Sequence, residues 1–157
     1  MTKILPIIHK AAALAAFTLI VTFFISSLMV DMFGDQQALI KVKANIFQAV
    51  WLLIPLMALA GMTGAKMAPK VTSGPIALKK KRMPYIALNG LFILLPAAYI
   101  LNNLAQEGEF NRLFYLVQTI ELLAGFINIS LMSFNIRDAM SLKRYARQPV
   151  TKAPNKG

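Results

Sequence analysis

The chain has 157 residues, of which 57% are hydrophobic and only 15% are charged, against roughly 25% in an average soluble domain. It has no cysteine, which excludes disulfides, cysteine-ligated metals and thiol nucleophiles, and its single histidine excludes a bis-histidine haem within one chain. A net charge of +11 would suggest nucleic acid for a soluble protein. Here the charges lie between long apolar runs, so we expect no nucleic-acid partner.

Four apolar runs are long enough to cross a bilayer, which takes about 20 residues. Residues 11–30, 44–65 and 85–104 contain no charge, whereas 113–136 contains Glu121. No small-residue cleavage site follows the first run, so we expect a retained helix there rather than a cleaved signal peptide. The sequence therefore predicts an all-α integral membrane protein built as a four-transmembrane-helix bundle.

The connections between these runs predict how they pair. Residues 31–37 and 102–112 are short, which predicts two antiparallel hairpins. The longer connection, 65–84, contains two prolines and a glycine before Pro84, so we expect a loop there and a third helix that begins at Pro84. The predicted helices are residues 7–33, 38–66, 84–105 and 112–141 of one domain, 1–147, followed by a disordered basic cytoplasmic tail, 148–157.

Basic residues are concentrated on one side of the predicted spans. The N-terminal segment, the second-to-third connection and the tail hold 14 of the 17 lysines and arginines. The other side has only Lys41, Lys43 and Arg112, beside four acidic residues. Because cytoplasmic loops are enriched in Lys and Arg, we expect both termini to be cytoplasmic.

A dense basic cluster precedes the third run. Such a cluster usually fixes orientation and attracts anionic headgroups, at about 1 kcal/mol per charge near the membrane surface. An acidic protein partner is the other interpretation. The residues of this cluster are Lys79, Lys80, Lys81 and Arg82.

The fourth run carries a carboxylate, Glu121, roughly 12 Å from its start at about 1.5 Å per residue. An ionisable group inside a span costs about 2.5–3.5 kcal/mol on insertion scales, so a partner is expected. Three roles stay open: a structural bond within the bundle, polar contact with another protein's helices, or a site for a proton, ion, quinone or small solute. One helix face holds the whole polar stripe, which consists of Gln118, Glu121, Gly125, Asn128 and Asn135.

The predicted second helix offers partners for Glu121 in the same half of the membrane. Lys41, Asn45 and Gln48 share one face, and Lys43 points elsewhere. The two lysines could instead only anchor the helix at the interface. The candidate partners of Glu121 are therefore Lys41, Lys43, Asn45 and Gln48.

Little in the sequence suggests chemistry. It offers no serine–histidine–acid arrangement, no glycine-rich phosphate loop and no metal-ligand cluster, so we expect no catalytic residue, no metal and no activity of its own. No cofactor is expected either; the alternatives are a quinone or a haem bound by His9 and a methionine. Pro55 and Pro96 lie inside two spans, where they could create a small cavity or only irregular packing.

Two segments, KRMPYIALNGLFILLPAA (81–98) and GEFNRLFYLVQTIELLAGFINISLMSFNIRDAMSLK (108–143), resemble a class of small four-span bacterial inner-membrane proteins. The resemblance implies an inner-membrane location and carries no activity or site residue. With little mass outside its spans, the chain is expected to be a non-enzymatic accessory or assembly subunit of a larger membrane complex. Its expected partners are lipid, anionic headgroups and other membrane subunits or further copies of itself. The alternatives are a small transporter or proton-path component using Glu121, and a haem- or quinone-associated subunit.

Overall fold

The computed structural model describes residues 4–67 and 74–147, and nearly all of them are helical. The predicted tail, 148–157, lies outside the described residues. Within the described ranges, four helical stretches are long and apolar enough to cross a membrane. The elements are α1 (Ile4–Phe33), α2 (Gln36–Met67), α3 (Gly74–Asn89), a π-helix η1 (Gly90–Leu94), α4 (Leu95–Gln106) and α5 (Arg112–Arg147).

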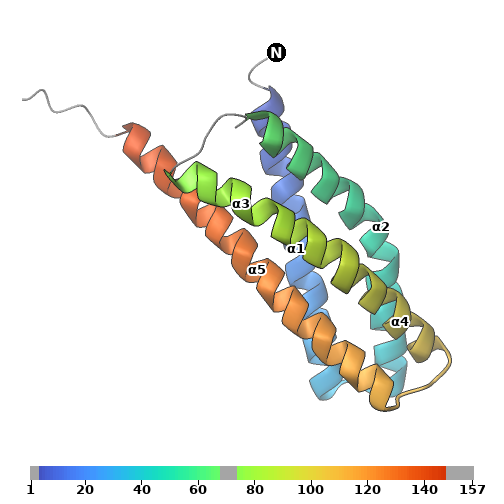
Figure 1. Ribbon diagram of the computed structural model, residues 1–157. Coiled ribbons are helices and arrows are strands. Elements are labelled where there is room, and N and C mark those ends of the chain that lie inside the picture. The colour runs from blue at the N-terminus through green and yellow to red at the C-terminus, as the bar shows by residue number, and fades with distance from the viewer. Residues whose placement is uncertain (1–3, 68–73, 148–157) are drawn as a thin grey trace, which may run out of the picture.

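The helices form one bundle of neighbouring antiparallel rods (Figure 1). α1 packs along α2, and α3, η1 and α4 form one continuous rod that packs along α5. The start of α1 and the end of α5 lie at the same end of the bundle, where the α1–α2 pair and α5 diverge (Figure 1). The two short turns lie at the opposite end.

The third span begins at Gly74, ten residues before the predicted start, so the prediction of a loop up to Pro84 is wrong. Pro75 occupies the first turn of α3, where a proline is tolerated because its missing N–H would have no partner there. It therefore starts the helix rather than breaking it. Pro84 lies inside α3, and the basic cluster 79–82 is on a helix rather than in a loop.

The third proline of this rod, Pro96, directly follows a wider turn. The Leu95 N–H donates to the carbonyl of Gly90, five residues back instead of four. In a regular α-helix the Pro96 ring would clash with the carbonyl of Phe92. The π-turn gives the ring room, which is how a π-bulge accommodates local strain without ending a helix.

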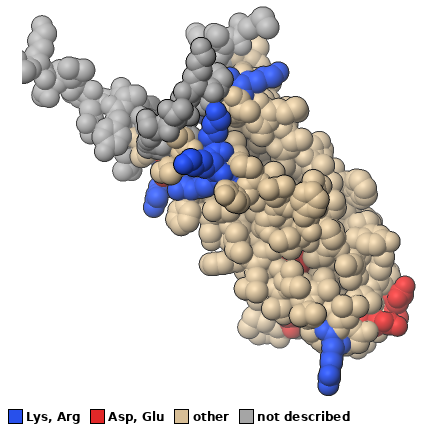
Figure 2. Space-filling model, in the orientation of Figure 1, with Lys and Arg blue, Asp and Glu red and all other residues tan. Residues whose placement is uncertain are grey.

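The apolar core is densest near the two short turns. Leu101 and Phe114 are fully buried there, packed with Val30, Leu39 and Val117. The outer surface instead carries many exposed large apolar side chains, which is typical of a surface that faces lipid. The bundle is thus closed by packing at the turn end. The face drawn in Figure 2 carries few charged side chains between the two ends of the bundle.

Candidate functional site

The polar stripe of α5 faces the interior of the bundle. Asn128 is fully buried, and Glu121 is only 8% exposed. Gln118 and Asn135 are also buried. A Cβ atom at Gly125 would lie 3.4 Å from the Phe24 ring, so α1 approaches α5 closely at this glycine. The stripe therefore meets protein rather than the outer surface.

Glu121 forms a buried ion pair with Lys43. The Lys43 Nζ lies 2.5 Å from Glu121 Oε2, and Lys43 is 1% exposed. Ser27 Oγ donates to the same carboxylate oxygen at 3.0 Å and accepts from Lys43 Nζ at 2.5 Å. Because the three residues come from α1, α2 and α5, this polar triad (Ser27, Lys43, Glu121) joins three helices.

Of the four candidate partners in α2, only Lys43 is buried. Its position is in phase with Leu39, Ile46 and Val50, which form the buried face of α2. The other three candidates are exposed and do not bond Glu121; they are Lys41, Asn45 and Gln48.

Ser27 was not among the residues predicted from the sequence. In the part of the chain that the structure describes, two other hydroxyl residues of α1 bond only within their own helix. Thr22 and Ser26 donate to carbonyls of their own helix, at 2.8 and 2.6 Å. The one available signal for Ser27 was its spacing from the small and apolar residues Ala16 and Ile20, which share the buried face of α1.

Asn128 meets an amide from the third span. Asn89 Nδ2 donates to Asn128 Oδ1 and to the carbonyl of Ala124, both at 2.8 Å. Asn128 Nδ2 makes a longer contact, 3.5 Å, with the carbonyl of Ile86. These bonds hold α3 against α5.

His9 lies at the end of the bundle where α1 begins and is buried. Its Nδ1 lies 2.9 Å from the carbonyl of Ala60, an acceptor, so this nitrogen carries the proton. Nε2 is then the acceptor, and Lys79 Nζ lies 3.3 Å from it. Both ring nitrogens have protein partners, so this geometry does not favour His9 as a haem ligand.

The basic cluster divides into two pairs on α3. Lys79 and Arg82 are partly buried, and Arg82 Nη1 binds Asp138 Oδ2 on α5 at 2.6 Å. Lys80 and Lys81 are exposed. Lys79 and Arg82 thus contact residues of α1 and α5, whereas Lys80 and Lys81 face outward.

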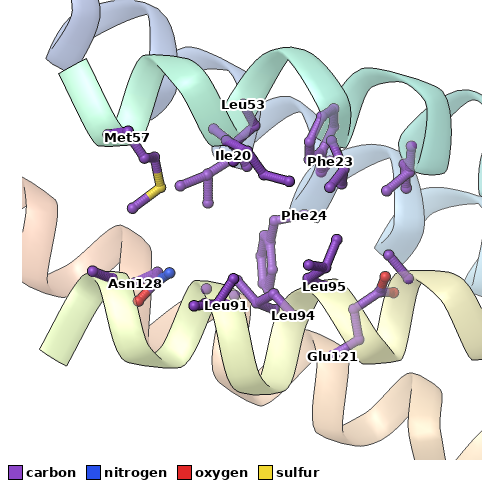
Figure 3. A pocket seen from close by; sticks show the side chains of 18 of the residues that line it. Ile20, Phe23, Phe24, Leu53, Met57, Leu91, Leu94, Leu95, Glu121 and Asn128 are labelled. Atoms are coloured by element: carbon purple, nitrogen blue, oxygen red, sulfur yellow. The ribbon is translucent and has the colours of Figure 1, made fainter. Parts of the chain in front are cut away.

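A cavity of about 400 Å³ lies between the α1–α2 pair and the third span. Figure 3 shows Glu121 at one end of this cavity and Asn128 at the other. Its walls include residues next to Pro55 and Pro96, such as Ile54 and Leu95. Almost all lining side chains are apolar; those labelled in Figure 3 are Ile20, Phe23, Phe24, Leu53, Met57, Leu91, Leu94 and Leu95.

A second cavity, of about 290 Å³, adjoins the first. The two share three lining residues, Met57, Gly61 and Ala87. The second reaches the end of the bundle that carries His9 and Lys79. We call the two cavities together the interhelical slot.

Among the described residues, no cluster of histidine and acidic side chains could hold a metal ion. A scan against protein-family models, a search of curated proteins and a search of solved structures each returned no match.

Proposed function

We propose that the protein is a four-span protein of the bacterial inner membrane that binds an apolar membrane molecule between its helical hairpins and catalyses no reaction. The observation that carries this proposal is the apolar cavity of about 400 Å³ that ends at the Ser27–Lys43–Glu121 triad. Small-molecule sites have volumes of about 300–1,000 Å³ and are mostly apolar with a few polar groups.

The cavity is only partly enclosed, and its walls are almost entirely apolar. Water is a poor occupant because it needs two to four polar partners, which these walls do not offer. An apolar molecule is therefore the occupant that the physical chemistry favours.

The membrane orientation in this proposal has both termini in the cytoplasm. It is supported by the charge distribution: Lys and Arg gather at the end where α1 begins, and acidic residues gather at the other end (Figure 2). Reporter domains fused to either terminus should be active only in the cytoplasm. Activity of either fusion on the outer side would contradict the proposed orientation.

The alternative of a proton path through Glu121 stays a prediction. Glu121 is the one titratable residue among the described residues that line the first cavity. A proton path needs a chain of water or titratable groups, and these apolar walls supply neither. The geometry therefore favours a ligand over a proton.

The accessory-subunit prediction also stays open. It rested on the small mass outside the spans, on the lack of a catalytic set and on a polar stripe that could contact another protein's helices. Glu121 and Asn128 have partners within their own chain. The stripe therefore no longer requires a partner subunit.

Gly61 offers a direct test of ligand binding. It lines both cavities, and a Cβ there would have nothing within 4 Å. Gly61→Phe should place its ring in the slot and exclude the ligand, which we expect to lower ligand retention about tenfold, equivalent to about 1.4 kcal/mol. Retention is measured by native mass spectrometry of protein taken from membranes in lipid nanodiscs.

Ala65→Phe is the matched control, because Ala65 is exposed one turn further along α2. It should keep the wild-type amount of bound molecule. If Gly61→Phe fails to fold, the smaller Gly61→Leu takes its place. The proposal is overturned if the wild type carries no apolar molecule or if the folded Gly61 variant carries the same amount.

A further inference from the structure

The occupant of the slot can be narrowed from the polar groups at its open end. We infer that it is an anionic phospholipid, with one acyl chain in the slot and its phosphate beside Lys10 and Lys79. This inference rests on the proposed function, because it assumes that the slot holds an apolar chain. It adds to that function the chemical class of the bound molecule and its orientation in the slot.

The slot has the length and direction that an acyl chain needs. It extends from Glu121 to Asn135, fourteen residues along α5, or roughly 21 Å at 1.5 Å per residue. One leaflet occupies about half of a 30 Å hydrocarbon core, so a chain entering from one face would fit within this length. The polar triad ends the slot at its far side.

The open end carries positive charge without a matching acid. Lys10 and Lys79 both line the second cavity, from α1 and α3. Within the described chain, neither lysine forms an ion pair. The bond from Lys79 to neutral His9 uses one of its three ammonium hydrogens, which leaves two donors for a phosphate oxygen. Two cations at the end of an apolar slot thus match a phosphate and an acyl chain.

The test uses nanodiscs that hold equal amounts of phosphatidylglycerol, phosphatidic acid and phosphatidylcholine with identical acyl chains. Native mass spectrometry of the wild type should show phosphatidylglycerol retained about tenfold over phosphatidylcholine, since each nearby lysine favours the anionic headgroup. Lys10→Gln with Lys79→Gln should bring that ratio close to one. Phosphatidic acid, which is also anionic, should be retained as strongly as phosphatidylglycerol, because the two lysines bind the phosphate that both lipids carry.

A charge-matched control is Lys66→Gln with Lys81→Gln, because both lysines are exposed and neither lines the slot. It should leave every ratio unchanged. Equal retention of all three lipids by the wild type would overturn the headgroup inference and leave the proposed function standing. Retention of no lipid would overturn both. Release of bound phosphatidylglycerol by millimolar inorganic phosphate would show a site for free anions and also overturn the inference.

Discussion

At the scale of single residues, the bundle depends on one buried charged pair. Lys43 and Glu121 are both buried, and Ser27 bonds both of them. Taking two charges out of water is costly, and their attraction compensates only while both are present. Removing one partner therefore leaves an uncompensated buried charge.

Single substitutions of this pair should be far worse than the double substitution. Lys43→Met or Glu121→Leu alone should lower the free energy of unfolding by about 3–5 kcal/mol, and the double variant should recover most of that loss. Unfolding in detergent micelles, followed by circular dichroism, measures it.

The exposed Lys41 on the same helix provides the control: Lys41→Met should change stability by less than about 0.5 kcal/mol. Additive losses in the double variant would mean that the two side chains do not interact in the membrane.

The candidate site was partly predictable at this scale. Helical spacing alone grouped Gln118, Glu121, Asn128 and Asn135, and all four are buried. The spacing of α2 also places Lys43 in phase with apolar residues, which could have singled it out among the four candidate partners of Glu121. Ser27 was not predicted because burying a hydroxyl inside a membrane helix costs little free energy. A serine in an apolar run is therefore not a signal of a buried polar contact. The role of Ser27 follows from which helices are neighbours, which is a tertiary property.

At the scale of elements, hydropathy correctly predicted four long apolar helices. The positions of prolines, however, did not correctly predict where the third of them begins. A proline near a glycine is compatible both with a loop and with the first turn of a helix. Pro75 does the second, and α3 begins ten residues earlier than expected. The π-turn before Pro96 has no local signature either, because it depends on how the ring and the neighbouring helices share space.

The early start of α3 is testable by hydrogen exchange. Amides of residues 79–83 lie inside α3 and should be protected, because each can donate to a carbonyl one turn back. The amides of Phe110 and Asn111, in the turn before α5, donate no backbone hydrogen bond within the described chain; they are the internal reference and should exchange fast. If both groups of amides exchange at the same rate in nanodiscs, residues 79–83 form a loop, as the sequence predicted, and not a helix.

At the scale of the whole molecule, the bundle is closed at one end and diverges at the other. Leu101, Phe114 and the polar triad fill the turn end. The slot lies between the hairpins and reaches the basic end, where Lys10 and Lys79 lie. This asymmetry was not predictable from the sequence, because the cavities arise from the relative placement of α1, α2, α3 and α5. The sequence reading named a cavity between Pro55 and Pro96 only as one of two possibilities.

The central claim is that the slot holds an apolar molecule of the membrane. The most direct measurement is an experimental structure of the protein in lipid nanodiscs, at a resolution that separates acyl chains from side chains. The account predicts elongated density passing Met57, Gly61 and Ala87, with no side chain assigned to it. Hairpins closed against each other with no such density would contradict it.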